Sequence, residues 1–155
     1  MNKEIRRQER KITEKQALDI LKEGEYGVLS MCTPENEGYG IPLSYALDNN
    51  KIYFHCAVEG SKLDYLRSNN RVSFCVVGKT QVLPSKFSTI YESAIAFGKI
   101  KEVSGNEKRN ALMLLVEKYS NNFIEEGKEY IEKSFDRVIV LVLSIESITG
   151  KARKQ

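Results

Sequence analysis

Two spacings of apolar residues run through the chain, and together they predict its secondary structure. Segments rich in β-branched and aromatic residues, or with apolar and polar positions in alternation, predict β-strands. These segments are residues 26–32, 39–47, 51–56, 71–77, 88–103 and 138–148. Apolar residues three or four positions apart, bounded by capping residues and glycines, predict α-helices. The predicted helices cover residues 14–23, 61–68, 106–119 and 128–134.

The connections between these segments predict how the strands pair. Residues 48–51 form a tight polar turn, so the strands over 39–47 and 51–56 are expected to form a hairpin. Such a short connection excludes the crossover that a parallel pair would need. Gly98 interrupts the long strand over 88–103 and predicts a bend or a β-bulge there. We therefore expect a mainly β fold, a small antiparallel barrel with helices packed outside it.

The composition fits one globular domain. The chain has 155 residues, of which 41% are hydrophobic and 29% charged, as expected for a protein with a sizeable core. We interpret residues 1–12 as a basic arm and residues 13–155 as a single domain. The longest apolar run, residues 138–143, has the length of a strand and not of a membrane span, and the charged start lacks the apolar core of a signal peptide. We therefore expect a cytoplasmic protein with no membrane association.

Charge, cysteine and histidine content narrow the kinds of ligand. The net charge of +3 is too mild to predict nucleic-acid binding, but it suits a small anionic ligand. Cys32, Cys56 and Cys75 each lie in a strand-like segment and are expected to be buried free thiols. With one histidine and no Cys-x-x-Cys motif, the sequence predicts no metal site.

The segment over residues 52–66 carries the clearest chemical signal. An apolar strand passes through Gly60 into a helix whose expected N-cap is Ser61, with Asp64 as its capping-box partner. A cation in the first turn opposes the helix dipole unless an anion compensates it, so Lys62 indicates a phosphate at this helix N-terminus. The alternative is an ordinary capped surface helix with a solvated Lys62.

Several segments together resemble the FMN-binding split barrels of the pyridoxamine 5′-phosphate oxidase type, and among them the nitroimidazole-resistance (Nim)-related flavoproteins. The segments are Gly-Ile-Pro-Leu-Ser-Tyr at 40–45, Ile-Tyr-Phe-His-Cys-Ala at 52–57, Glu-Gly-Ser-Lys-Leu-Asp at 59–64, Tyr-Glu-Ser at 91–93 and Ile-Thr-Gly-Lys-Ala-Arg at 148–153. The resemblance spans nearly the whole chain past Thr13. It implies a homodimeric split barrel in which each FMN lies between two subunits.

The resemblance also implies a set of FMN-binding residues. Those that would line the isoalloxazine are Pro42, Leu43, Ser44 and Tyr45. Those that would lie along the ribityl chain are His55, Cys56 and Ala57, and those that would bind the phosphate are Ser61 and Lys62. Those that would approach the flavin from the partner chain are Tyr91, Ser93, Lys151 and Arg153.

Two departures from the oxidase change the chemistry that the resemblance implies. The oxidase has an Arg and a nearby His at its C-terminus for the vitamin, whereas here Arg153 is followed by Lys154 and Gln155. The sequence therefore predicts no oxidation of vitamin B6. Ser61 and Lys62 also stand where the oxidase subgroup tends to have an Arg–Lys pair, which implies fewer ionic contacts to FMN.

Two kinds of side chain invite a catalytic interpretation. His55 is the only histidine, and its ordinary pKa near neutrality suits proton transfer. We interpret it instead as a hydrogen-bonding residue that positions the ribityl chain or the phosphate. Among the tyrosines at strand positions, we expect Tyr45 and Tyr91 to stack on the flavin or on a flat substrate, whereas Tyr39 and Tyr53 fit packing.

Two functional hypotheses from different classes follow. The first is an FMN-dependent oxidoreductase that reduces small nitroaromatic compounds with NADH or NADPH and needs no protein nucleophile. The second is a flavin- or haem-binding module that carries or senses its ligand without turnover. Bleaching of the flavin by NADH or NADPH without oxygen would separate the two. Nucleic-acid binding on a barrel face lacks the interleaved basic and aromatic pattern and is not expected.

Overall fold

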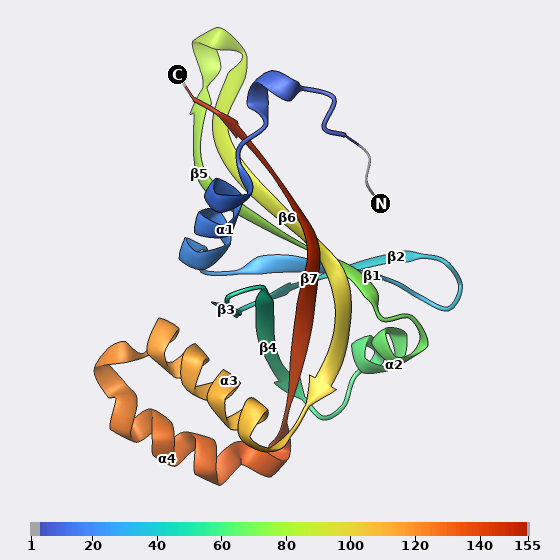
Figure 1. Cartoon of the computed structure of the whole chain (residues 1–155), viewed down its shortest axis with the longest axis vertical. Helices are drawn as coiled ribbons and strands as arrows, with labels where there is room; N and C mark the ends of the chain where they lie inside the picture. The colour runs from blue at the N-terminus through green and yellow to red at the C-terminus, as the bar shows by residue number, and fades with distance from the viewer. Residues whose placement is uncertain (1–3, 155) are drawn as a thin grey trace.

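The computed structural model describes residues 4–154, which form one seven-stranded sheet flanked by helices (Figure 1). Residues 1–3 of the predicted arm and Gln155 lie outside the described residues. The strands are β1 (Gly27–Cys32), β2 (Gly38–Leu43), β3 (Ala46–Asp48), β4 (Lys51–Ala57), β5 (Arg71–Leu83), β6 (Ser88–Val103) and β7 (Val138–Arg153). The helices are α1 (Glu14–Glu23), α2 (Ser61–Ser68), α3 (Gly105–Tyr119) and α4 (Ile124–Ser134). The mainly β fold is confirmed.

The strand order is β2-β1-β5-β6-β7-β4-β3, with every neighbouring pair antiparallel. The two outermost strands, β2 and β3, are nevertheless consecutive in the chain, joined only by Ser44 and Tyr45. Three residue steps span about 11 Å at most, so the two edges of the sheet must lie close together. The sheet therefore curls into a barrel that stays unpaired between β2 and β3, and β1 and β2 run across the direction of β6 and β7 (Figure 1).

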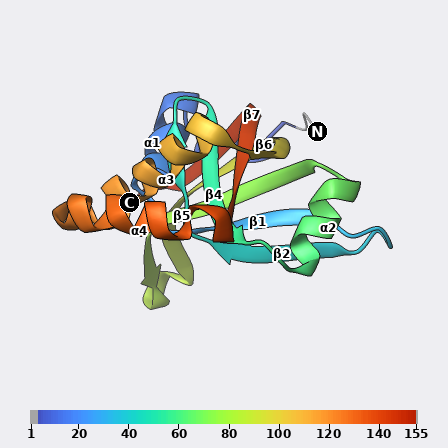
Figure 2. The same cartoon turned by 90° about the horizontal axis from the view of Figure 1, so that it is seen from below.

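The fold has two apolar cores, one inside the barrel and one on part of its outer surface. Inside, the alternating side chains of the strands pack with α1, through Ala17, Ile20 and Leu21. Outside, α3 and α4 pack over β3, β4 and the first half of β7 (Figure 2). No helix within residues 4–154 combines the length and hydropathy needed to cross a lipid bilayer.

The strand predicted over residues 39–47 is in fact two strands. β2 pairs with β1, whereas β3 pairs with β4, so the predicted hairpin holds only for the short β3. The reason is the closure of the barrel, because a chain that passes from one edge of the sheet to the other changes its pairing partner.

Three elements extend beyond their predicted ends. β5 continues through Gly78, beyond the predicted end at residue 77, with a register shift. β7 continues to Arg153, beyond the predicted end at residue 148, because these residues pair with β6. α4 begins at Ile124, one turn earlier than predicted. Tertiary pairing and packing, which a local pattern does not carry, extend all three.

The predicted irregularity at Gly98 is confirmed. β6 has the predicted bounds, and its register with β7 shifts between Phe97 and Gly98. A Cβ at Gly98 would overlap the carbonyl oxygen of Ser144 on β7. The close approach of the two backbones therefore requires glycine at this position.

The starts of α1 and α2 are capped differently. Thr13 and Gln16 form a reciprocal capping box at the start of α1. α2 has its predicted bounds, but its N-cap is Gly60, with φ 138°, and no side chain caps it. The prediction of Ser61 as the N-cap is wrong, because glycine adopts this backbone conformation where other residues are strained. Ser61 consequently lies in the first turn.

Candidate functional site

Strand alternation sorts the predicted flavin-binding residues into two sets. His55 and Ala57 are exposed on the outer face of β4, and Cys56 between them points into the barrel core. Pro42 is exposed and pairs with Val28, whose side chain is also on the outer face. The inward-facing members of the predicted set are Leu43, Tyr45 and Cys56.

Tyr45 is part of the core rather than of a ligand surface. Its side chain is fully buried, its ring packs edge-on against Phe74 at 4.8 Å between centroids, and its hydroxyl donates to the carbonyl of Leu21. Burial raises the pKa of the Tyr45 hydroxyl. The prediction that Tyr45 stacks on a flavin is therefore wrong for the side chain, and only its backbone borders the split.

The side chains of Cys56 and Leu43 also point into the barrel. Cys56 is 7% exposed, and burial raises the pKa of its thiol while the nearby charge of Lys62 lowers it. Leu43 packs against the same interior cluster. These side chains line the barrel, so any contact with a ligand outside it would come from their backbones.

Ser44 and His55 lie just beyond the last residue pair of the β3–β4 ladder. Ala46 pairs with Tyr53 at the end of the β3–β4 ladder. Continuing this register by two residues aligns Ser44 with His55, and both residues are exposed. The surroundings of His55 lower the pKa of its imidazole by desolvation, so the ring is neutral at pH 7.

The start of α2 lies beyond the end of β4 and offers donors for an anion. The carbonyl of Gly60 accepts the N–H of Leu63 at 3.2 Å, but no side chain caps the helix. Ser61 is exposed and Lys62 half-buried, and within residues 4–154 no carboxylate forms an ion pair with Lys62. The first turn therefore carries backbone N–H groups, a hydroxyl and an ammonium group, the kinds of donor that an anion site requires.

The other predicted residues gather on β6 and β7. Tyr91 pairs with Arg153, and Ser93 pairs with Lys151, all on the face opposite the inward-pointing Ala94. Tyr91 is also contacted by a residue that the sequence analysis did not identify. Arg10, from a 3₁₀ turn over Gln8–Arg10, donates to the hydroxyl of Tyr91 at 3.5 Å, and its guanidinium lies 6.0 Å from the centroid of the Tyr91 ring.

The two groups of predicted residues lie far apart in one chain. His55 pairs with Val140 at the start of β7, whereas Ser93 pairs with Lys151 near its end. Eleven residue steps of β7 separate these positions, about 36 Å of extended strand. In one chain, His55 therefore lies far from the cluster of Tyr91, Ser93, Lys151 and Arg153 on β6 and β7.

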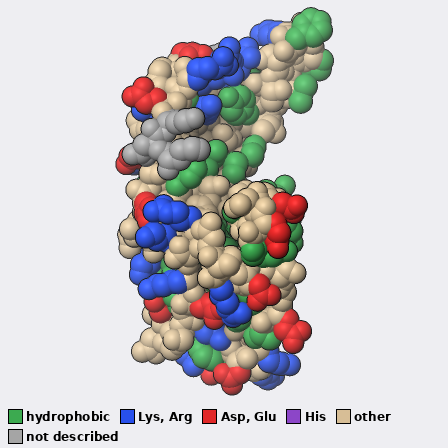
Figure 3. Space-filling view, turned by 90° about the vertical axis from the view of Figure 1, so that its right-hand side faces the viewer, with side chains coloured by type: hydrophobic (Ala, Val, Ile, Leu, Met, Phe, Trp, Pro, Cys, Tyr) green, Lys and Arg blue, Asp and Glu red, His purple; other side chains and the backbone are tan. Residues whose placement is uncertain are grey.

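An apolar surface connects the two groups on the outside of the barrel. Pro42, Val28, Cys75 and Ile95 follow one another across β2, β1, β5 and β6 in a single cross-strand row. Val28 and the neighbouring Val77 are 39% and 58% exposed. Apolar side chains also gather at the end of the β5–β6 hairpin, which projects at the top of Figure 3. We call the surface formed by Val28, Cys75, Val77 and Ile95 the outer apolar face.

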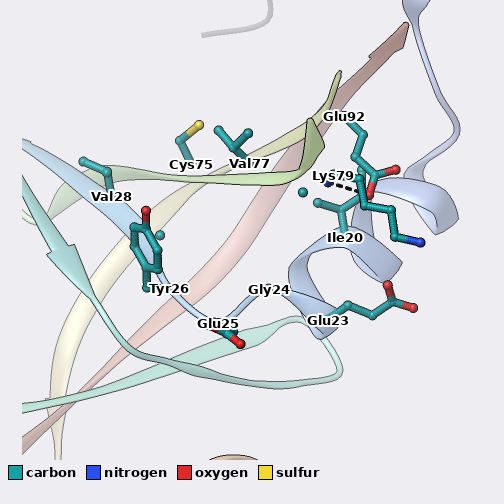
Figure 4. Close-up of a pocket in the computed structure, with 12 residues that line it drawn as sticks. Ile20, Glu23, Gly24, Glu25, Tyr26, Val28, Cys75, Val77, Lys79 and Glu92 are labelled. Atoms are coloured by element: carbon teal, nitrogen blue, oxygen red, sulfur yellow. Dashed lines mark hydrogen bonds between the residues drawn. The ribbon is translucent and has the colours of Figure 1, made fainter. Parts of the chain in front are cut away.

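A cavity of about 480 Å³ is partly lined by this face and lies between the end of α1, the start of β1 and β5 (Figure 4). One side is apolar, with Tyr26, Val28, Cys75 and Val77. The other side is charged, with Glu23, Lys79 and Glu92, whose carboxylate accepts the backbone N–H of Lys79 at 3.1 Å. The volume is in the range of small-molecule sites. Sequence reasoning missed the cavity because its residues come from separate elements and form no motif.

The architecture is that of a split barrel, an antiparallel sheet that curls on itself and remains unpaired at one seam. The family model described as pyridoxamine 5′-phosphate oxidase matches residues 13–152, and the chain belongs to this family. No curated protein matches the chain significantly.

Solved structures share the fold at low identity. A candidate 5-nitroimidazole antibiotic resistance protein from Bacteroides thetaiotaomicron is 23% identical, with a TM-score of 0.79 over 91% of this chain and 85% of that one. The conserved hypothetical protein Rv2991 from Mycobacterium tuberculosis is 15% identical, with a TM-score of 0.81 over 96% and 90%. An FAD- and haem-binding protein from Mycobacterium smegmatis is 16% identical, with a TM-score of 0.80 over 92% and 72%. At these identities the similarity concerns the fold alone.

Proposed function

We propose that the protein is a homodimeric FMN-dependent oxidoreductase that reduces small nitroaromatic compounds with NADH or NADPH. The observation that carries this proposal is the separation of the two groups of predicted residues on one outer surface. Each group alone is half of a flavin site, and a second copy related by a two-fold axis would supply the missing half. The outer apolar face between them is the kind of surface that such a copy would cover.

In the first half-site, the start of α2 would hold the FMN phosphate. Ser61 and Lys62 would give charge-assisted hydrogen bonds, supplemented by the free N–H groups of the first turn. His55 and Ala57, with the backbone of Cys56, would lie along the ribityl chain. The residues that would border the isoalloxazine are Pro42 and Ser44, with the backbones of Leu43 and Tyr45.

The second half-site would come from the partner chain. Lys151 and Arg153 would bring positive charge to the flavin, and Tyr91 and Ser93 would pack beside it. When bound, FMN supplies the electron or hydride transfer. The residues of the chain then have three tasks, which are to orient the ring, to exclude water and to stabilise negative charge. Lys151 or the backbone N–H of Ser44 would serve the last task.

The cavity partly lined by the outer apolar face would receive the substrate. Its apolar side adjoins Pro42 through the paired Val28, so a flat aromatic compound in it would lie next to the ring. A neutral His55 fits a positioning role better than that of an acid at pH 7. Support for nitroaromatic substrates comes from the similarity to the candidate resistance protein of Bacteroides thetaiotaomicron.

The alternative function is that of a non-catalytic flavin- or haem-binding module. The similarity to an FAD- and haem-binding protein from Mycobacterium smegmatis favours it. Anaerobic titration separates the two proposals. The enzyme predicts that added FMN binds, is bleached by NADH or NADPH, and regains its colour on addition of a nitroimidazole. Bound flavin that resists both donors would reject the enzyme in favour of the module, and a Soret band after haem addition without FMN binding would identify haem as the ligand.

A further inference from the structure

Ser44 and Tyr45 form the crossover between β2 and β3. They lie at the seam of the barrel, the split where the sheet provides no hydrogen bonds. These two residues carry the chain from β2 at one edge to β3 at the other. Neither takes part in a strand ladder within residues 4–154. Something other than the sheet must therefore hold their backbone, since backbone polar groups near a core need partners.

The end of α3 supplies these hydrogen bonds. The backbone N–H of Tyr45 donates to the hydroxyl of Tyr119 at 2.9 Å, and Nζ of Lys118 donates to the carbonyl oxygen of Tyr45 at 3.0 Å. The Tyr119 hydroxyl in turn donates to the carbonyl of Glu25, just before β1. We call Lys118 and Tyr119 the α3 clasp, because they tie the crossover to the segment that leads into β1.

Packing keeps the α3 clasp directed at residue 45. Nζ of Lys118 lies 3.7 Å from the centroid of the Tyr45 ring, a cation–π contact that adds to the hydrogen bond. The same ring is buried against Phe74, and its hydroxyl is bonded to Leu21 of α1. Both the backbone and the side chain of Tyr45 are thus fixed from different elements. The direction in which the chain leaves Tyr45 toward Ser44 follows from these contacts.

We infer that Lys118 and Tyr119 are positioning residues for the flavin, an inference that rests on the proposed function. The clasp occupies both backbone polar groups of Tyr45, so it fixes the path of Ser44 and Pro42 along the outer side of the seam. Neither clasp residue is among those assigned to touch FMN. Because ligand contacts weaken with displacements of about 1 Å, a crossover released from the clasp binds FMN less tightly and orients the ring less well.

Two variants test this inference. Tyr119→Phe removes only the hydroxyl, and Lys118→Met keeps the side-chain stem without the ammonium. The control is Tyr130→Phe on α4, a tyrosine that is 71% exposed and whose hydroxyl has no partner in the described part of the chain. Amide hydrogen exchange over residues 42–47 is measured in the ligand-free protein, and FMN binding is then followed by flavin fluorescence and visible circular dichroism.

We expect exchange over residues 42–47 to accelerate about 10-fold in both clasp variants, as for loss of one local hydrogen bond. The Kd for FMN should rise by a similar factor of about 10, with a weaker visible circular dichroism band, while Tyr130→Phe changes neither. A general loss of stability would instead accelerate exchange throughout the core.

The outcomes separate the inference from the function on which it rests. Unchanged exchange over residues 42–47 would overturn the clasp. Faster exchange with unchanged affinity and an unchanged spectrum would overturn its role in positioning. If the wild-type protein bound no FMN, the proposed function and the flavin role would both be rejected, and the exchange comparison would still decide whether the clasp holds the crossover.

Discussion

At the scale of single residues, His55 yields a prediction for the pH dependence of stability. Desolvation lowers the pKa of His55, so the folded protein binds this proton less readily than the unfolded chain does. Above the ordinary value both states are neutral and the residue contributes nothing. As the pH falls below about 6.5, the unfolded chain takes up the proton first, so the free energy of unfolding should decrease toward the lower folded-state pKa.

The measurement is urea unfolding at about pH 7.5 and about pH 5.5, on either side of the ordinary histidine value. The chain has one histidine, so His55→Gln is a matched control that keeps a polar side chain without a titrating group. The variant should lose less stability over this interval than the wild type. Equal losses would show that His55 does not cause the pH dependence.

The phosphate site proposed at the start of α2 gives the second prediction at this scale. Replacing Ser61 and Lys62 together by alanine should weaken FMN binding by roughly 2–4 kcal/mol, because two charge-assisted contacts are lost. Isothermal titration calorimetry measures the affinity. The matched control is the adjacent Lys133 and Ser134 on α4, likewise changed to alanine. Unchanged affinity in the Ser61 and Lys62 variant would reject the assigned phosphate site.

At the scale of elements, local patterns predict a helix or strand well where residues within that segment determine its ends. The bounds of β6 and α2 follow from alternation, turn residues and helical spacing within each segment. The split of the strand over 39–47 into β2 and β3 could not be predicted, because it depends on which partners the two halves find across the sheet. Residues 149–153 belong to β7 for the same reason, since their pairing with β6 is a tertiary contact.

The pairing of β6 with β7 yields a prediction for the stability of the fold. Gly98→Ala would place a methyl group against the backbone carbonyl of Ser144, which cannot move as a flexible side chain would. We expect a loss of about 1–3 kcal/mol, or roughly 2–4 °C in Tm for each kcal/mol in a chain of this size. The control is Gly38→Ala on β2, where an added methyl group meets nothing within 4 Å. Similar Tm values for the two variants would contradict the close approach at Gly98.

At the scale of the whole molecule, neither the outer apolar face nor the cavity that it partly lines could be predicted from local patterns. Tyr26, Val28 and Val77 occupy ordinary strand or turn positions, and they are exposed because no helix among residues 4–154 covers this part of the barrel. The separation of the two groups of predicted residues likewise needed the register of β7 with both of its neighbours. The resemblance to the family implies a site shared between two chains, and the distance along β7 is consistent with that proposal.

A charge placed on the outer apolar face should therefore affect assembly and flavin together. Val77 is 58% exposed and points outward, so Val77→Lys should leave the isolated barrel folded while it prevents a second copy from covering this face. We expect sedimentation velocity to show a dimer for the wild type and a monomer for the variant. The same sample should lose bound FMN, because Tyr91, Ser93, Lys151 and Arg153 of the second copy are no longer at the flavin.

Tyr130→Lys provides the matched control for that prediction, since it adds the same charge at an exposed aromatic position on α4, away from the outer apolar face. It should remain dimeric and keep its flavin. A Val77→Lys protein that is monomeric but still yellow would show that one chain suffices to bind FMN, and a dimer that persists would place the interface on another surface. Because the two readouts respond to different parts of the proposal, assembly through this face and sharing of the flavin are tested separately in one experiment.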